Sequence, residues 1–573
     1  MRSQSHTKSQ VLRWLLVLIF TTVALALVAG PTLAGTPQQV QEGMVITGLL
    51  RNPQGGAIQG ARIAAFTPNG NEALVDTESQ EDGTWALQFD ELNSQALVIV
   101  VSHHHYVNQT TNLDAVALGR LAENGSLGLG ESVLERQVTP GFWAAGAIFV
   151  AVLLLIAFEK LHNTAAALVG LSAIFLVTYV LGNIRSGFYI IGFERALDYI
   201  NWEVIFLVMG MMIVIAVIER TGIFQWTAFQ AYRLSRGRTW MLVLILMLVT
   251  AVASALLDNF TTMLLMAPIS LQIGLALGIN PLALIIPEIM ASNVGGISTL
   301  IGTPTNILIG AYADIGFSDF LVNQTAGVVV ALILMGLYVL WHYRAEWRKH
   351  PGGISETLYA RLEKNAELND PHGLLKSGIV FVLILAGFVL GENFHIVPAV
   401  PALVGATVLL LWLKPDVHAM IQAVDWTTLV FFMALFIVVG AIQEVGMLGF
   451  AADWMAALIG ENLNLGIFVM VIGVGTLSMV VANIPLAASF LPIVDFLSGS
   501  IPGASNKVLY YALSMGAAMG GNGLLISAEA NLVTAGITTQ ADTPISFVEF
   551  MKIGIPVTLI TLLVGFGWLI LRF

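Results

Sequence analysis

The sequence predicts an all-α polytopic membrane protein, built from two inverted repeats of about five transmembrane helices plus a re-entrant hairpin each, with a small extracytoplasmic β-sandwich domain. Three observations predict this fold class. The chain of 573 residues is 57% hydrophobic and 10% charged, and its mean hydropathy is +0.83, which places most of it in lipid. The apolar part contains an internal repeat. A polar segment with short alternating apolar runs precedes that part.

Composition also excludes several kinds of site. The chain has no cysteine, so disulfides, thiolate metal sites and catalytic thiols are excluded. The formal net charge of −12 says little about partners, because in a membrane protein the side on which Lys and Arg fall matters more than their sum. We expect membrane lipid as the surroundings and no nucleic-acid partner.

The N-terminal segment, residues 1–34, has the pattern of a secretory signal. Arg2, Lys8 and Arg13 precede an apolar run, and small residues up to Ala34 follow it. A signal peptide cleaved after Ala34 and an uncleaved first transmembrane helix both fit this pattern. In both cases the segment that follows is exported.

Residues 41–137 are expected to form the extracytoplasmic β-sandwich, because short runs of strand-forming residues alternate with Gly, Asn, Asp and Pro. The predicted strands cover 45–50, 62–66, 84–89 and 96–101. The glycine pattern and the sequence Asp-Gly-Thr-Trp that ends at Trp85 resemble a carboxypeptidase regulatory-like domain, which implies a fold and no particular activity.

Three consecutive histidines, His103, His104 and His105, lie in this predicted domain. Imidazole is a common metal ligand. Neighbouring side chains in a strand point to opposite faces, however, so the three cannot all bind one ion, and we expect no metal site.

The membrane region divides into repeat 1 (141–345), a cytoplasmic linker (346–376) and repeat 2 (377–573). The repeat is visible because residues 254–268 match residues 478–492 at one constant offset. The matched pairs include Asn259 with Asn483, Pro268 with Pro492, and, after a shift of one residue, Asn306 with Asn531.

The positive-inside rule gives the orientation of the repeats. Two connections rich in Lys and Arg are predicted to be cytoplasmic, whereas those around Gly192 and Glu461 are poor in both and are predicted to lie outside. For these sides to be consistent, each repeat must cross the membrane an odd number of times, which makes the repeats inverted. Five crossings per repeat meet this condition if 242–276 and 466–497 are re-entrant hairpins. The basic residues are Arg220, Arg233, Arg236 and Arg238 on one connection and Arg344, Arg348, Lys349, Arg361, Lys364 and Lys376 on the other.

Four polar breaks, at 258–262, 302–306, 483–485 and 520–531, interrupt the apolar segments. Non-helical backbone at membrane depth is tolerated only inside protein or beside a wet cavity, and it frees carbonyls and helix N-termini for ions or polar solutes. Small residues and Asn also pack and cap helices, but four breaks at matching positions favour a transport site. The candidate substrate- and ion-binding residues are Asp258, Asn259, Thr261, Thr262, Asn293, Thr303, Thr305, Asn306, Asn483, Asn522, Ser527, Glu529 and Asn531.

Ionisable residues in the apolar segments are functional hypotheses by default. Asp258 and Glu529 lie within the breaks and are the expected proton carriers, which exchange H+ for a cation. Glu288 follows a proline and is expected to be structural and to face the interface, whereas Asp425 and Glu444 lie near helix ends, where capping or solvation is expected. No Lys or Arg lies at any break, which disfavours a dianionic substrate.

Two segments, 291–310 and 513–531, carry the motifs that resemble a known family. They resemble the ArsB/NhaD branch of the ion transporter superfamily, which includes arsenite permeases, sodium–proton antiporters and the melanosomal P protein, and is similar more distantly to citrate and dicarboxylate carriers. The resemblance covers 143–573 and implies a homodimer that works by an elevator motion. It implies a role for Asp258, Asn259, Asn306, Asn483, Asn522 and Asn531.

The sequence departs from the family pattern in two places. Many relatives have an acidic residue at the position of Thr303, so a cation site at that loop is in doubt. The dicarboxylate carriers have Ser-Asn-Thr at both hairpin tips, where this chain has Asp-Asn-Phe at 258–260 and Asn-Ile-Pro at 483–485. The second departure weakens a carboxylate substrate.

These observations predict a secondary active transporter of the plasma membrane rather than an enzyme. We expect it to exchange a small inorganic solute, by Na+/H+ antiport or by efflux of arsenite or antimonite, with H+ or Na+ as coupling ion and no other cofactor. The alternative is a sodium-coupled citrate or dicarboxylate carrier. An intramembrane hydrolase that uses Asp258 and Glu529 as an acid–base pair would lack a nucleophile motif, and a ligand sensor would show no flux.

Overall fold

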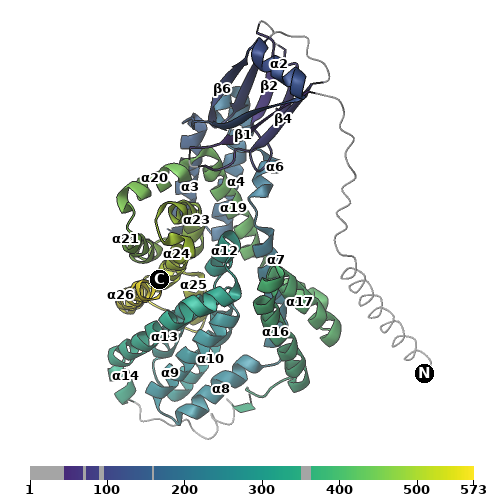
Figure 1. Cartoon of the computed structure of the whole chain (residues 1–573). Coiled ribbons are helices and arrows are strands. Elements are labelled where there is room, and N and C mark those ends of the chain that lie inside the picture. The colour runs from purple at the N-terminus through teal and green to yellow at the C-terminus, as the bar shows by residue number, and fades with distance from the viewer. Residues whose placement is uncertain are drawn as a thin grey trace, which may run out of the picture. The chain divides into compact units, whose positions relative to one another are not determined.

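The computed structural model describes residues 44–53, 55–68, 72–89, 96–157, 161–349, 363–364 and 366–573. These residues belong to two compact units that divide between Glu135 and Arg136 (Figure 1). The predicted signal segment, 1–34, and residues 350–362 of the predicted linker lie outside the described residues.

The first unit is the predicted β domain, which the structure confirms as two sheets around one apolar core. Both sheets contribute to that core, for example through Ile46 and Leu87 from one and Ile63 and Ile99 from the other. The first sheet has the order β4 (Thr84–Phe89), β1 (Met44–Arg51), β7 (Ser126–Val133), and the second β3 (Val75–Glu78), β2 (Arg62–Phe66), β5 (Leu97–His103), β6 (Tyr106–Leu113).

All four predicted strands are present, and β3, β6, β7 and the helix α2 (Ala115–Asn124) were not predicted. The missed strands are polar, and β7 pairs with β1 in parallel, far from it in sequence. The premise about the histidines was also wrong: only His103 is in a strand, and His104 and His105 form the turn before β6. Among the described residues, no three His, Cys, Asp or Glu side chains are placed to hold a metal ion.

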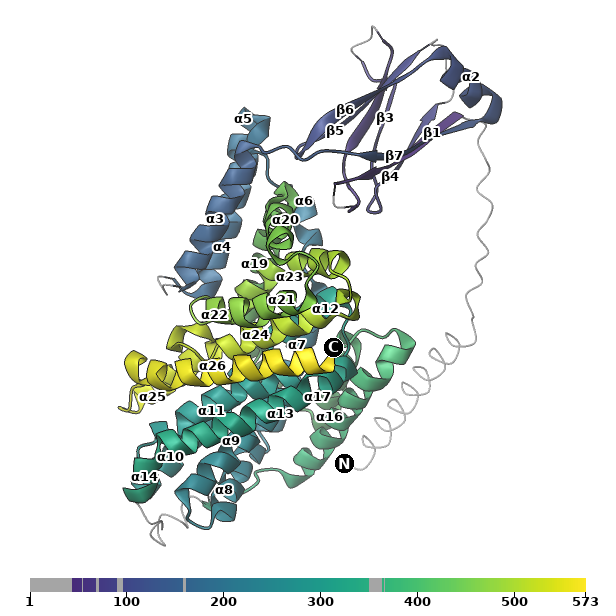
Figure 2. The same ribbon diagram turned by 60° about the vertical axis from the view of Figure 1, so that its left-hand side comes forward.

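The second unit is helical (Figure 2), and its elements follow the same order twice along the chain. Eight helices in the described ranges are long and apolar enough to cross a membrane. The first repeat contains α3 (Pro140–Ala157), α4 (Asn163–Leu176), α5 (Gly182–Ile184), α6 (Phe193–Asp198), α7 (Trp202–Glu219), α8 (Ile223–Ser235), α9 (Thr239–Leu256), α10 (Asn259–Leu277), α11 (Leu282–Gly295), α12 (Pro304–Ala313), α13 (Phe317–His342) and α14 (Arg344–Lys349). The second contains α16 (Pro371–Gly391), α17 (Ala399–Leu413), α18 (Val417–Gln422), α19 (Trp426–Val445), α20 (Met447–Ile459), α21 (Leu463–Phe468), α22 (Val474–Ser478), α23 (Asn483–Ser500), α24 (Val508–Gly520), α25 (Glu529–Gln540) and α26 (Phe547–Arg572).

Helix α16 begins inside the predicted linker, at Pro371. The side chain of Asp370 accepts a hydrogen bond from the backbone N–H of Gly373 at 2.8 Å, and Pro371 occupies the first helical position, where its missing N–H costs nothing. The helix therefore begins at this cap, a few residues before its apolar run.

The predicted helix breaks occur at matching places in the two repeats. The gap between α11 and α12, residues 296–303, corresponds to the gap between α24 and α25, residues 521–528. Likewise α9 and α10 are separated at 257–258, and α22 and α23 at 479–482. Helices α9 and α10 are each long enough to cross a membrane, so the re-entrant path of this hairpin stays a prediction.

The repeats pack across one another rather than side by side. Helix α4 packs against α19 and α7 against α17, while α10 of repeat 1 packs against α25 of repeat 2 and α12 against α23. The contact between α10 and α25 brings the tip of the first hairpin to the broken helix of the second repeat.

Candidate functional site

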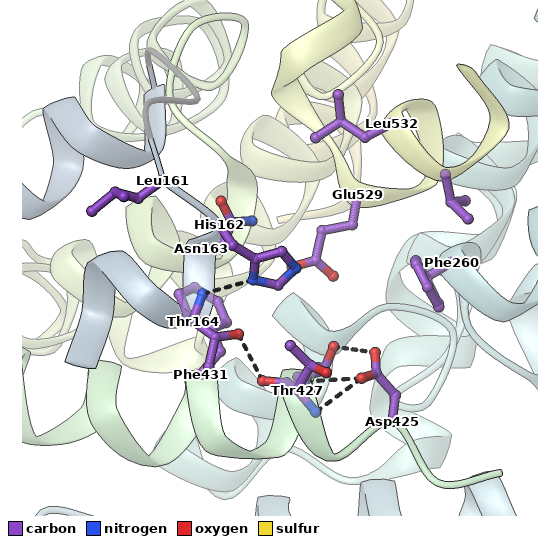
Figure 3. Close-up of a pocket in the computed structure, with 12 residues that line it drawn as sticks. Leu161, His162, Asn163, Thr164, Phe260, Asp425, Thr427, Phe431, Glu529 and Leu532 are labelled. Atoms are coloured by element: carbon purple, nitrogen blue, oxygen red, sulfur yellow. Dashed lines mark hydrogen bonds between the residues drawn. The ribbon is translucent and has the colours of Figure 1, made fainter. Parts of the chain in front are cut away.

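A cavity of about 640 Å³ lies where four helices begin: α4, α10, α19 and α25 (Figure 3). The N-terminus of a helix carries partial positive charge, and acidic residues stand at three of these four starts. Asp258 caps α10, Asp425 caps α19, and Glu529 is the first residue of α25. The carboxylates offset the helix dipoles and supply the oxygen atoms that a hard cation prefers.

The two carboxylates that the sequence singled out line the same small space. Asp258 and Glu529 both line a narrow space of about 20 Å³ next to the cavity, together with Thr428 and Pro304. The Asp258 carboxylate accepts hydrogen bonds from the backbone N–H and the hydroxyl of Thr261, both at 2.7 Å. A carboxylate has about four lone-pair sites, so Asp258 keeps acceptor capacity beyond these two bonds.

Asp425 caps a helix, as expected, and also lines the large cavity, which the sequence did not predict. The expected capping is confirmed: its side chain accepts from the backbone N–H of Thr427 at 3.0 Å and of Thr428 at 3.2 Å, and from the Thr428 hydroxyl at 2.5 Å. Asp425 also lines the large cavity with Glu529. This wall of the cavity forms because α4 packs against α19. Nothing in the sequence predicted that packing.

The charged site occupies only one of the two positions that the repeats make equivalent. The counterpart of Asp258 at the second hairpin tip is Ala482, the residue before α23, and the counterpart of Glu529 is Pro304, the first residue of α12. The fold is duplicated, but this pair of carboxylates is present once.

A second cavity of about 330 Å³ lies where α7 and α17 begin and reaches along α12. In the predicted inverted topology these helix starts face the opposite side of the membrane from those of α4 and α19. In the described part of the chain no Lys or Arg lines either cavity, although the Lys507 amino group donates to the Asp314 carbonyl at 2.5 Å. The ionisable residues that line the second cavity are Glu203, Asp314, Asp319, Glu392 and His395.

Asn306 and Asn531 hold the two helix breaks in the same way. The Asn306 side-chain amide donates to the carbonyls of Ile297 at 3.0 Å and Thr299 at 2.8 Å. The Asn531 amide donates to the carbonyls of Gly521 at 2.8 Å and Leu524 at 3.0 Å. Both side chains are fully buried, so each satisfies carbonyls that the broken helix leaves without helical partners.

Asn293 connects the first hairpin tip to the second break. Its carbonyl oxygen accepts from Asn259 at 2.9 Å, and its amide donates to the side-chain oxygens of Asn522 at 2.9 Å and Asn531 at 3.0 Å. These four asparagines, all buried, make one network within the protein. A buried polar network whose members are all paired holds its side chains in fixed positions.

The remaining candidates cap a helix, bond to the second break, have a buried hydroxyl without a partner in the described structure, or begin a helix. The Ser527 hydroxyl donates to the carbonyls of Gly521 and Leu524, and the Thr303 side chain accepts from the Asn306 N–H as the cap of α12. Thr262 and Thr305 have buried hydroxyls without a hydrogen-bond partner in the described structure, and Asn483 is the buried first residue of α23.

Glu288 does not face the interface as expected. It is 0% exposed inside the helical unit, where one carboxyl oxygen accepts from the Thr250 hydroxyl at 3.3 Å. It lines neither of the two cavities. The proline before it, Pro287, lies inside α11, and every residue of α11 is buried, so this part of the helix does not reach the surface.

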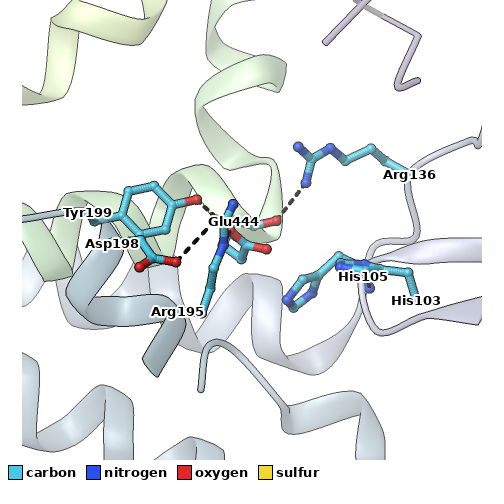
Figure 4. A network of polar contacts seen from close by, with 7 residues as sticks. All are labelled: His103, His105, Arg136, Arg195, Asp198, Tyr199 and Glu444. Carbon is cyan, nitrogen blue, oxygen red and sulfur yellow. Dashed lines mark hydrogen bonds and ion pairs between the residues drawn. The ribbon is translucent and has the colours of Figure 1, made fainter. Parts of the chain in front are cut away.

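Glu444 also has a different role from the solvated one expected, because its side chain is only 13% exposed and is paired (Figure 4). Its carboxylate accepts from the Arg195 guanidinium at 3.3 Å and from the Tyr199 hydroxyl. Its backbone carbonyl accepts from Arg136 at 2.7 Å. This network ties the start of the helical unit and α6 to the end of α19.

Arg195→Ala is expected to lower the free energy of unfolding by about 2 kcal/mol. This loss lies between the contribution of an exposed ion pair and the cost of removing one partner of a buried pair. Thermal unfolding of the purified protein in detergent measures the effect. The matched control is Arg185→Ala, at an exposed arginine on the same connection. Equal unfolding temperatures for the two variants would show that the pair contributes nothing.

Comparison with known proteins places this architecture in a family. Residues 153–508 match the family model described as a citrate transporter, CitMHS. The chain is 36% identical over 428 residues to a 46 kDa membrane protein of Mycobacterium leprae, covering 74% of this chain and 97% of that protein. It is 32% identical over 451 residues to an uncharacterized transporter of Synechocystis sp., covering 74% and 96%.

The relationship to the P protein that the two motifs implied is confirmed. The human P protein is 31% identical over an alignment of 513 residues, gaps included, and the match covers 76% of this chain and 60% of the P protein. Together with the helices long enough to span a bilayer, these matches show a multi-pass membrane protein. The chain belongs to the CitMHS citrate transporter family, a family of secondary transporters within the ion transporter superfamily.

Proposed function

We propose that this transporter exchanges a small monovalent cation, with Na+ as the first candidate, for protons at the site formed by Asp258 and Glu529. The observation that supports the proposal is electrostatic. Both cavities that reach the helix breaks are lined by carboxylates, and no Lys or Arg lines either of them in the described structure. Such walls attract cations and repel a polyanion.

Proton and cation compete for the same groups in this scheme. Two unneutralised carboxylates in the narrow space beside Pro304 carry a large desolvation cost. The site is therefore stable when it holds protons or when it holds a cation, and its empty charged form is rare. Competition of this kind couples the two flows without a direct cation–proton contact.

Access alternates by relative motion of two groups of helices. The helices α10, α12, α23 and α25 carry the breaks, and α4, α7, α17 and α19 form the walls of the two cavities. A shift of the first group against the second would open the site to one cavity and close it to the other, which is the elevator motion expected for this superfamily.

Flux in proteoliposomes that contain an internal pH dye tests the proposal. Separate additions of Na+, Li+, arsenite and citrate are compared in vesicles with and without the protein. A proton signal evoked by Na+ or Li+ supports cation–proton antiport. Uptake of arsenite or citrate without a signal from Na+ alone would overturn the cation assignment and leave the transporter fold in place.

A further inference from the structure

An apolar groove of about 310 Å³ runs between α9 and α13, apart from both cavities of the proposed site. Leu248, Ile333 and Leu337 line it and are each more than half exposed. Gly336 gives the groove its depth, because a Cβ atom there would lie 3.2 Å from a methyl group of Leu244 on the opposite wall. The groove is therefore a depression of defined shape on the exposed surface of the helical unit.

The length of the groove matches one leaflet of a bilayer. Its α13 wall extends from Val329 to Leu340, which is about 17 Å at 1.5 Å per helical residue. The hydrocarbon core of a bilayer is about 30 Å thick. A groove of this length holds one acyl chain of a single leaflet.

Two tryptophans and two arginines stand at one end of the groove. Thr299 donates to the carbonyl of Ala255 at the end of α9, and the carbonyl of the neighbouring Ser298 accepts from Thr325 in the first half of α13. The two helices are therefore antiparallel, and since Gly336 packs opposite Leu244, the start of α9, with Arg238 and Trp240, lies at the same end as Trp341 and Arg344. All four side chains are exposed.

Arg344 keeps donors for a ligand. Its guanidinium lies 5.0 Å from the centre of the Trp341 ring, and one N–H donates to the Trp341 carbonyl at 3.4 Å. A guanidinium carries five N–H donors, so most of them are left for another acceptor. The sequence that follows adds Arg348 and Lys349 against one acid, Glu346.

We propose that this groove binds an anionic phospholipid of the predicted cytoplasmic leaflet, with one acyl chain between α9 and α13 and the phosphate at Arg238 and Arg344. Tryptophan and arginine at headgroup depth are the usual anchors at a membrane interface. Clustered basic residues beside a transmembrane helix attract anionic headgroups.

A second copy of the chain fits this face less well. A two-fold dimer joins the same patch of both subunits, and both subunits must have one orientation in the membrane. The basic ends of the two grooves would then lie at the same depth and close together, with like charges facing each other. The chemistry of the groove end thus favours an anionic lipid.

Native mass spectrometry of the full chain in detergent tests the proposal, with phosphatidylglycerol and phosphatidylcholine of identical acyl chains as probes. We expect tighter binding of phosphatidylglycerol by the wild type. Arg344→Gln should weaken phosphatidylglycerol about fivefold, because one basic residue contributes about 1 kcal/mol at an anionic surface, and should leave phosphatidylcholine unchanged. Arg185→Gln, at an exposed arginine on another connection, is the matched control and should change neither.

A second variant separates the groove from its charged end. Leu337→Trp fills the groove and keeps the arginines, so it should weaken both lipids, whereas Leu383→Trp, at an equally exposed site on α16, should weaken neither. Equal affinity of the wild type for the two lipids, or unchanged phosphatidylglycerol binding by Arg344→Gln, would overturn the proposal. So would a change from dimer to monomer in Leu337→Trp with lipid binding unchanged, since a second copy would then be the occupant.

Discussion

Glu529→Gln is expected to reduce cation-driven proton movement to the level of vesicles without protein, and Asp258→Asn is expected to do the same. Each substitution keeps the shape of the side chain but removes the only group at its position that binds and releases a proton. The two carboxyl groups line one space of about 20 Å³, so neither can be replaced by a more distant acid without a change in the path of the ion. The dye assay in proteoliposomes measures the loss directly.

The control for this experiment is Glu461→Gln, at an exposed residue between α20 and α21, which should transport like the wild type. Equal protein content and equal unfolding temperatures establish that the site variants insert and fold. Retained, pH-sensitive exchange in both Glu529→Gln and Asp258→Asn would exclude these residues as proton carriers. The acidic walls at Asp425 or Glu203 would then be the next groups to test.

The asymmetry of the repeats makes this prediction sharper than one for a duplicated site. The position equivalent to Asp258 is Ala482, and the position equivalent to Glu529 is Pro304. A transporter with two equivalent charged sites would keep part of its function after one substitution. Here no second pair exists at the equivalent positions, so complete loss is expected.

The architecture was readable from the sequence wherever the signal was local or repeated. The break at Gly302-Thr303-Pro304 and the Gly-Gly-Asn-Gly segment at 520–523 predicted where helices stop, because several Gly and Pro residues close together weaken helical hydrogen bonding, whereas single prolines such as Pro268 and Pro287 lie inside helices. The alternating runs of β1, β2, β4 and β5 predicted half-buried strands, because alternation of apolar and polar residues is also a local signal.

Features that depend on contacts between distant segments were not readable. Asp425 looked like an ordinary helix cap, and only the packing of α4 against α19 brings it to the cavity of Glu529. Glu444 looked solvated, although Arg195 and Tyr199 reach it from a connection far away in the sequence. The asparagines were correctly expected at the breaks, but their partners are backbone carbonyls whose positions follow only from the folded chain.

Those partners change what an asparagine substitution should do. Asn531→Ala removes two amide bonds, to the carbonyls of Gly521 and Leu524, and the acceptor for Asn293. A buried polar group left without a partner costs about 1–3 kcal/mol, so we expect a loss of about 3 kcal/mol or more in the free energy of unfolding. The matched control is Asn462→Ala, which removes an exposed cap of α21 and should cost about 1 kcal/mol.

Hydrogen exchange in lipid nanodiscs distinguishes this holding role from direct contact with the transported ion. Asn531→Ala should speed exchange at residues 521–528, and Asn306→Ala should do the same at residues 296–303, because each amide holds the corresponding break. The effect should be present without any transported ion. If either variant keeps wild-type exchange and unfolding temperature but binds the ion more weakly, the asparagine acts on the ion itself. Faster exchange at both breaks would instead mean that each repeat holds its break with the same side chain, an asparagine whose amide donates to carbonyls of the break.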